Sequence, residues 1–452
     1  MQNLQRQVLN VARKTEHSDM TETPISPPPS RILHTLHKAA LPQWSAEGSS
    51  RIPFWAYTDE AVYQRELERF FYNGHWCYVG LDAEIPHAGD FKRTKVGERS
   101  VIMIRDKDGT VNVVENRCAH RGVAFCRERT GNKTELVCPY HQWNYNLKGD
   151  LQGVPFRRGL KQDGRTIGGM PADFDLKQHG LTKLKVALRG GALFASFDHS
   201  VAELDDYLGP TICRYFDRVF DGRKLTLLGY NRQRIPGNWK LMQENIKDPY
   251  HPGLLHAWFV TFGLWRSDNK AQLLMDAKQR HAAMISTRGN AGQAGAATSG
   301  VTSFKDTMKL NDDRFLDVVH EPWWGEPTAV MTTIFPSLII QQQVNSLSTR
   351  HIQPNGPTSF DFVWTHFGFE DDTPEMQRRR LRQANLFGPA GFVSADDGEV
   401  IEFSQDSFTS NRLGDKSTIA ELGGKTAEDT DHMVTETLIR GMYAYWREVM
   451  GV

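Results

Sequence analysis

Hydrophobic and polar residues follow two different periodicities along this 452-residue chain. Residues 59–71 carry apolar side chains at the spacing of an amphipathic helix. From Trp76 to about Phe197, short alternating runs such as SVIMIRD (100–106) and TVNVVEN (110–116) predict β-strands separated by turns. Beyond that point, helical and strand-like patterns are mixed. The chain is therefore predicted to be α+β, with a small all-β domain before a larger α+β domain.

The changes of pattern also predict where the domains begin and end. The proline-rich run TPISPPPS (23–30) has no packing face, so roughly the first 45 residues should form a mobile arm. We expect four segments: an N-terminal extension over 1–47, a helical lead-in over 48–75, the all-β domain over 76–198, and the α+β domain over 199–452.

Within the α+β domain, we expect a long antiparallel sheet region and several helices. Strands are predicted over 330–352, and helices over 212–219, 241–262, 375–386 and from about 431 to the C-terminus. The Gly/Ala/Ser-rich run 288–300 predicts a loop. A loop of this length is either a lid over a site or a surface insertion without a role.

Composition and charge narrow the class of protein. Lys plus Arg and Asp plus Glu both number 54, so there is no basic excess of the kind that binds nucleic acid or a membrane surface. No run approaches 18 apolar residues, and the N-terminus lacks the apolar core of a signal peptide. We therefore expect a cytoplasmic protein. Five sparse cysteines do not form a disulfide framework, so those near histidines are candidate metal ligands.

The first candidate metal site lies in the all-β domain. Cys118-x-His120 is followed, after seventeen residues, by Cys138-x-x-His141. A structural zinc site is the alternative, but zinc fingers group cysteines together and histidines together. Here each limb pairs one Cys with one His, which suits a [2Fe–2S] cluster with one iron on thiolates and one on imidazoles. This pattern resembles the Rieske motif. Trp143 would pack over the cluster loops, and Cys126 is expected to be a buried structural thiol.

A second candidate site lies in the α+β domain. His251 and His256 are five residues apart, and Pro252 and Gly253 disturb the predicted helix between them, which can turn both rings to one side. By themselves two such histidines are also typical of a protein core. A carboxylate would complete a facial triad for non-haem Fe(II). Two adjacent aspartates, 396 and 397, follow the Gly/Pro-rich turn FGPAG (387–391), although a capped turn explains them equally well.

Asp248-x-x-His251-x4-His256, downstream of the first motif, resembles the large (α) subunits of Rieske non-haem iron aromatic-ring oxygenases from about residue 48 onward. The resemblance implies that His251, His256 and Asp397 bind a mononuclear Fe(II), with Asp396 as the fallback for Asp397. It implies that Asp248 is no ligand but connects His251 to the cluster ligand His141 of a neighbouring subunit. A ring of α subunits is required for that connection.

The resemblance also implies an activity and partners. It is strongest to the salicylate-hydroxylating members of the family, which implies 5-hydroxylation of salicylate to gentisate with O2. The alternatives are cis-dihydroxylation of another benzoate, such as terephthalate or anthranilate, and a Rieske electron carrier without oxygenase chemistry. A small β subunit, an α3β3 assembly, a ferredoxin and an NAD(P)H-dependent ferredoxin reductase are implied as well. The chain itself has no convincing nucleotide or flavin fingerprint.

The substrate pocket is the least specified part of the sequence. Strand alternation would turn Gln341 and Gln343, or else Gln342, toward the site, although a polar strand edge is an equal explanation. Apolar residues near the histidines could form its wall or simply the core. The candidate pocket residues are Gln341, Gln343, Leu255, Trp258 and Phe262. Arg266 and Lys247 are candidates for holding a substrate carboxylate, although surface charges would look the same.

Overall fold

The computed structural model describes Trp44 and residues 48–266, 268–288, 307–411 and 419–452. The N-terminal extension, apart from Trp44, and nearly all of the run 288–300 lie outside the described residues. None of the described helices is both long enough and apolar enough to cross a membrane.

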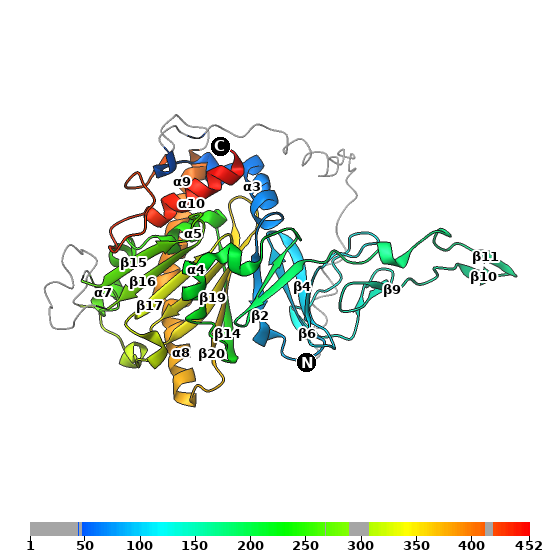
Figure 1. The fold of residues 1–452 in the computed structure, drawn as a ribbon, viewed down its shortest axis with the longest axis horizontal. Coiled ribbons are helices and arrows are strands. Elements are labelled where there is room, and N and C mark those ends of the chain that lie inside the picture. Colours follow the sequence, from blue (N-terminus) through cyan, green and yellow to red (C-terminus); the bar gives the residue numbers. More distant parts are fainter. Residues whose placement is uncertain (1–43, 45–47, 267, 289–306, 412–418) are drawn as a thin grey trace, which may run out of the picture. The chain divides into compact units, whose positions relative to one another are not determined.

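The segment between residues 77 and 196 is built almost entirely of strands, as predicted. Its sheets have the strand orders β5-β4-β3-β6, β12-β13-β2 and β7-β8-β9, and a hairpin of β10 and β11 extends away from them (Figure 1). The strands are β2 (Cys77–Leu81), β3 (Asp90–Val96), β4 (Arg99–Arg105), β5 (Val111–Glu115), β6 (Thr130–Asn132), β7 (Leu136–Val137), β8 (Asn144–Tyr145), β9 (Leu151–Gly153), β10 (Leu160–Gln162), β11 (Arg165–Ile167), β12 (Lys185–Arg189) and β13 (Ala192–Ser196).

The second part contains an antiparallel seven-stranded sheet in the order β14-β20-β19-β18-β17-β16-β15. The predicted strand region 330–352 forms three neighbouring strands of this sheet. Alternation along β18 turns Ile339 and Gln342 to opposite faces, since Ile339 packs in one hydrophobic cluster and Gln342 bonds Arg218 near helix α4. The strands are β14 (Leu225–Ile235), β15 (Lys270–Met275), β16 (Ala282–Thr287), β17 (Ala329–Ile334), β18 (Leu338–Gln343), β19 (Ser346–Pro354) and β20 (Phe360–Phe369).

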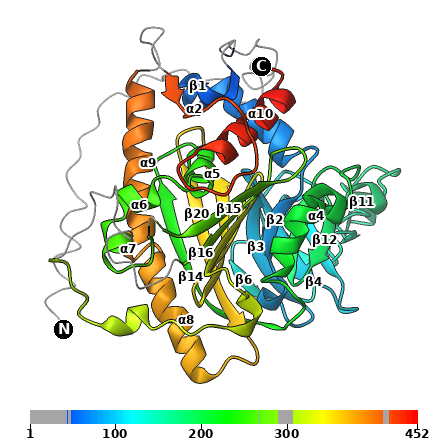
Figure 2. The same cartoon turned by 60° about the vertical axis from the view of Figure 1, so that its left-hand side comes forward.

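Helices cover both faces of this sheet. Helix α4 contacts β15 to β17 on the Gln342 face, whereas α5 contacts β17 and β19 and lies beside α9 (Figure 2). The predicted helix 241–262 is interrupted, because Asp248 adopts an extended conformation that ends α5. The helices are α4 (Leu204–Asp217), α5 (Trp239–Lys247), α6 (Pro252–Leu255), α7 (Ala257–Thr261), α8 (Pro374–Phe387), α9 (Phe392–Ser410) and α10 (Thr437–Met450).

The lead-in segment packs against the C-terminal end of the chain. Strand β1 (Arg51–Pro53) pairs with β21 (Ile419–Glu421), and helices α2 (Trp55–Thr58) and α3 (Glu60–Glu66) follow. The buried carboxylate of Glu66 lies 2.7 Å from Lys240 Nζ of α5 and accepts a hydrogen bond from Trp446 Nε1 of α10 at 2.8 Å. The segment expected to be a separate lead-in thus contributes to the core that surrounds α5.

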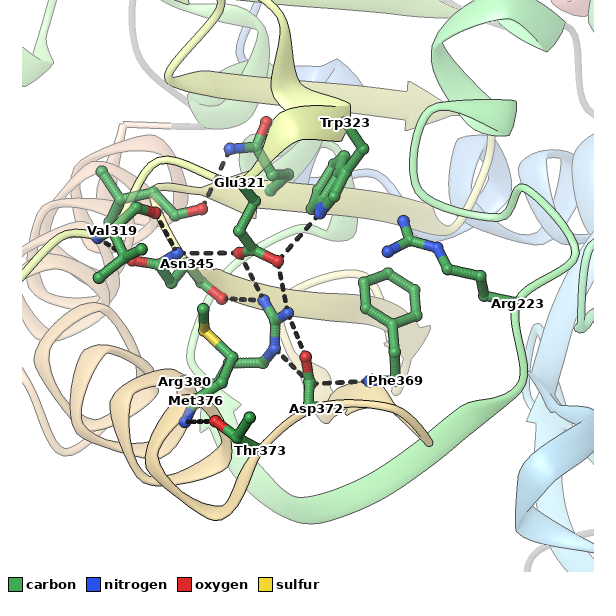
Figure 3. A network of polar contacts seen from close by, with 12 residues as sticks. Arg223, Val319, Glu321, Trp323, Asn345, Phe369, Asp372, Thr373, Met376 and Arg380 are labelled. Atoms are coloured by element: carbon green, nitrogen blue, oxygen red, sulfur yellow. Dashed lines mark hydrogen bonds and ion pairs between the residues drawn. The ribbon is translucent and has the colours of Figure 1, made fainter.

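A buried ionic cluster holds the turn between β18 and β19 (Figure 3). The Arg380 guanidinium of α8, 1% exposed, forms ion pairs of 2.7 Å with Glu321 and with Asp372. It also donates to the backbone oxygen of Asn345 at 2.7 Å, and the Asn345 amide donates to Glu321 at 2.8 Å. Because Asn345 lies in the turn, these contacts fix both strands that leave it.

Candidate metal centres and aromatic pocket

Three side chains from two separate segments converge beside the Ile339 face of the sheet. Asp397 Oδ1 lies 3.5 Å from His251 Nε2 and 3.2 Å from His256 Nε2. All three ligand atoms lie within 4.8 Å of one another, and no other such group occurs among the described residues. Ligands at about 2.1 Å and right angles around one ion lie about 3 Å apart, so the spacing suits a single metal ion.

The interrupted helix explains how the two imidazoles meet. Helix α5 ends at Lys247, His251 precedes the proline that begins α6, and His256 lies between α6 and α7 with non-helical dihedral angles. The two ring centroids are consequently 5.4 Å apart. A continuous helix would have turned residues five apart by 500° in total, and thus to different directions.

The two adjacent aspartates have different contacts. They lie in the second turn of α9 rather than in a capped turn, so their side chains diverge by about 100°. Asp396 Oδ2 lies 3.0 Å from His256 Nδ1, whereas Asp397 approaches both Nε2 atoms. Asp248 Oδ2 lies 3.2 Å from His251 Nδ1. Each imidazole thus has a carboxylate on Nδ1 and presents Nε2 to Asp397, an arrangement typical of metal-binding histidines and their outer partners.

The electrostatics of this cluster stabilise positive charge. Burial lowers the pKa of His251, but contacts with Asp248 and Asp397 outweigh it and raise this pKa to about 9. Burial raises the pKa of Asp397, but the two histidines hold it well below its usual range. Asn245 Nδ2 donates to Asp397 Oδ1 at 3.0 Å. The buried Asn245 Oδ1 has no partner in the described part of the chain. The donor set and its charge therefore fit a divalent cation.

A cavity that is partly open to solvent adjoins the three residues. Of the predicted pocket residues, Gln343 lines it. Gln341 lies behind, where its amide donates to Gln343 Oε1. Trp258 and Phe262 do not line the cavity, although they belong to the same hydrophobic cluster as the lining residues Phe259 and Trp265. Leu255 lines a different hollow.

The charged candidates for holding a carboxylate lie elsewhere. Arg266 forms an ion pair of 2.7 Å with Asp268, and the buried Lys247 donates to Gln243 and Thr333. Neither Arg266 nor Lys247 lines the cavity. Sequence reasoning missed Asn245 and Arg350, which do line it. The sequence did contain a signal for Arg350, because it is the one lysine or arginine in the predicted strand region 330–352.

Cys118, His120, Cys138 and His141 lie at the tips of two loops with the same hydrogen bonds. In each loop the cysteine oxygen accepts from the nitrogen four residues later, and its nitrogen donates to the oxygen five residues later, all at 2.9 Å. The fourth residue after each cysteine has a positive φ, which is 72° at Gly122 and 55° at Gln142. In such loops the backbone satisfies its own polar groups and leaves the side chains available as ligands.

The two cysteines and the two histidines of these loops differ in how deeply they are buried. Both cysteines are buried, and Cys118 Sγ contacts Tyr145 Oη at 3.2 Å. The imidazoles of His120 and His141 are half-buried, with ring centroids 4.6 Å apart. Trp143, 3% exposed, stacks on His120. Thiolates on one side and imidazoles on the other fit the two irons of a Rieske cluster. Cys126 is buried and bonds the Glu128 oxygen.

Comparisons with known proteins agree with both centres. Residues 75–163 match the Rieske [2Fe-2S] domain, and residues 219–452 match the ring hydroxylating alpha subunit (catalytic domain). The large oxygenase component of salicylate 5-hydroxylase from Ralstonia sp. is 74% identical, over 91% of this chain and 96% of that protein. The large subunit of anthranilate 1,2-dioxygenase from Burkholderia cepacia is 42% identical, over 90% and 94%.

Solved structures share the fold. The naphthalene 1,2-dioxygenase from Rhodococcus sp. bound to indole superposes with a TM-score of 0.70 at 22% identity, covering 93% of this chain and 97% of that one. The presence of the catalytic domain excludes a Rieske electron carrier without enzymatic activity. This chain belongs to the large (α) subunits of the Rieske ring-hydroxylating oxygenases, enzymes that contain a [2Fe–2S] cluster and a mononuclear iron.

Proposed function

We propose that this enzyme hydroxylates salicylate at ring position 5 to give gentisate. The observation that carries the proposal is the His251–His256–Asp397 cluster, which opens into a largely apolar cavity in a chain 74% identical to a salicylate 5-hydroxylase component. The relatives named for anthranilate and terephthalate, at 42% and 38% identity, also carry the names of aromatic acids. Biphenyl and benzene dioxygenase subunits, at 27–28%, do not.

The two metal groups are assigned to two ligand sets. In this proposal Cys118, His120, Cys138 and His141 bind the cluster, and His251, His256 and Asp397 bind the mononuclear iron. When bound, these groups supply single-electron transfer and activation of O2. Asp396 supports His256 through Nδ1, as Asp248 supports His251, and neither replaces Asp397 as a ligand.

The protein's part in the reaction is to orient the aromatic ring in the cavity. Phe259, Trp265 and Met331 line the cavity and supply apolar surface for an aromatic ring. Gln343 offers a polar group at the same wall, and Gln341 holds its amide in place. One edge of the aromatic ring can thus face the triad while the polar substituents of the ring contact Gln343 on the sheet.

Asp248 is proposed to connect subunits. Its side chain is 17% exposed and lies against His251, and His141 is also partly exposed, so a neighbouring copy could bring His141 to Asp248. The proposed assembly is α3β3, with a small β subunit, and a ferredoxin and an NAD(P)H-dependent reductase deliver electrons. The five cysteines of this chain form no disulfide in its described residues, which suits the reducing cytoplasm that supplies NAD(P)H.

An Asp248→Asn variant should separate electron delivery from substrate binding. The amide cannot supply the negative charge that Asp248 places on His251, so we expect turnover to fall by about 10–100-fold. Cluster content, iron content and salicylate affinity should stay near those of the wild type. Single-turnover oxidation of the reduced enzyme measures the defect directly. A normal rate of cluster oxidation in this variant would refute the assigned role of Asp248.

Product analysis tests the function itself. The α subunit, assembled with its β subunit, is incubated with ferredoxin, reductase, NADH, O2 and salicylate, and the products are separated by chromatography. Gentisate, formed with matched consumption of NADH, is the expected result. Oxidation of anthranilate or terephthalate to diols, with salicylate untouched, would instead favour cis-dihydroxylation. No product from any of these acids, with both metal groups intact, would contradict the proposal.

A further inference from the structure

Arg350 is a buried cation that forms no ion pair with any described residue, although the charge of Asp397 acts on it through space. It lies in β19, is 2% exposed, and pairs in register with Ile339 of β18 and Trp364 of β20. Its guanidinium stacks on the Trp364 ring at 3.9 Å from the centroid. No described residue forms a hydrogen bond or an ion pair with it, and its Nε atom is buried without a partner. The cation–π contact with Trp364 is therefore the strongest direct contact that Arg350 makes with a described residue.

The cost of this arrangement indicates a missing anion. Burying an uncompensated charge costs more free energy than a single cation–π contact returns. The paired Arg380 of the same domain shows how this chain satisfies a buried guanidinium, with two carboxylates and a backbone oxygen. Burial lowers the pKa of Arg350 to about 9, so it still carries its charge at neutral pH.

The position of Arg350 indicates where that anion would lie. Arg350 lines the same cavity as His251, His256 and Asp397, and it is the one lysine or arginine among the described residues of the lining. It forms no ion pair with Asp397, whose carboxylate is occupied by the two histidines and Asn245. The Arg350 guanidinium thus lies over Trp364 in a residue that lines the cavity, where a bound anion could reach it.

We propose that Arg350 forms a carboxylate-binding subsite, in which its guanidinium and the carboxylate of an aromatic acid make a charge-assisted pair within the apolar cavity. A planar guanidinium can bind a carboxylate through two parallel N–H···O bonds, which fixes direction as well as position. Arg350 and Asp397 attract each other through space but form no ion pair, so a carboxylate bound to Arg350 would lie beside the triad without replacing one of its ligands. A ring carbon distant from the acid group then faces His251 and His256.

This subsite rests on the proposed function for the identity of the acid, but its chemistry can be tested separately. The probes are salicylate and salicylamide, which differ in replacing the carboxylate by a neutral amide. Binding is measured by calorimetry on the oxidised, assembled enzyme without reductase, so that no turnover occurs. We expect the wild type to prefer salicylate, and Arg350→Met to lose about 100-fold or more of salicylate affinity while salicylamide affinity changes little.

Two further readouts exclude a merely structural role. Arg350→Lys keeps the charge but not the paired geometry, so it should recover part of the preference for salicylate. In the absence of ligand, Arg350→Met should unfold at the same or a higher temperature, because it removes an uncompensated buried charge. Equal loss of both ligands together with a lower unfolding temperature would overturn the subsite, as would an unchanged preference for salicylate.

The outcomes also separate this subsite from the proposed reaction. If the wild type binds salicylate through Arg350 but yields no gentisate with its electron partners, the subsite stands and the proposed function fails. If Arg350→Met makes gentisate with an unchanged KM for salicylate, the subsite fails and the function stands.

Discussion

Replacing Asp397 by alanine should remove the mononuclear iron and abolish product formation while leaving the [2Fe–2S] cluster in place. Asp397 is buried and its Oδ1 faces the Nε2 atoms of both His251 and His256. Removing it leaves two neutral nitrogen donors for a divalent cation. Loss of outer partners alone typically costs 10–100-fold, so loss of this carboxylate should cost more than about 100-fold in activity.

Three measurements on the Asp397 variant check this expectation. Iron per chain should fall by the iron that is not in the cluster, the reduced cluster should keep its electron paramagnetic resonance signal, and gentisate should disappear. Asp396→Ala, which loses only the contact with His256 Nδ1, should show a partial defect. Glu399→Ala is the matched control, since Glu399 is exposed on the same helix. Full iron content in Asp397→Ala would contradict the assignment of Asp397 as a ligand.

Replacing Arg380 by methionine should destabilise the catalytic domain by about 3–5 kcal/mol. The loss leaves the carboxylates of Glu321 and Asp372 close together and without their shared cation, in a part of the fold where little water can replace it. It also frees the Asn345 oxygen in the turn between β18 and β19 (Figure 3). Because Gln343 and Arg350 lie on the two strands that leave this turn, the cavity should loosen as well.

Urea unfolding followed by tryptophan fluorescence measures the effect of Arg380→Met. Arg378→Met is the matched control on α8, because Arg378 also pairs with a carboxylate, Glu375 at 2.9 Å, but is 63% exposed. An exposed pair of this kind contributes roughly 0–1 kcal/mol. Adding Glu321→Gln to Arg380→Met should recover part of the lost stability. Equal effects of the Arg378 and Arg380 substitutions would show that burial of the cluster does not matter.

The sequence alone determined the features whose geometry is local. Each proposed cluster ligand lies at the tip of a short loop between strands, and a Cys-x-His or Cys-x-x-His spacing is typical of such a loop. The order of the all-β and α+β segments followed from periodicity, because alternation and helical spacing are properties of neighbouring residues. The expectation that Pro252 and Gly253 break the helix between His251 and His256 was wrong in detail. Pro252 begins the short helix α6, which is a favourable position for proline, and the breaks lie at Asp248 and at His256.

Only the tertiary structure decided which distant side chains meet. Asp396 and Asp397 are equivalent in sequence, and only the direction of α9 brings Asp397 to the two Nε2 atoms and Asp396 to an Nδ1. Strand alternation predicted that Gln342 faces away from Gln341 and Gln343. It did not predict which face of the sheet each helix covers. Trp258 was therefore a reasonable wall residue that packs in a core cluster instead. Arg350 could be recognised only once burial, the absence of a described partner and its place in the cavity were known together.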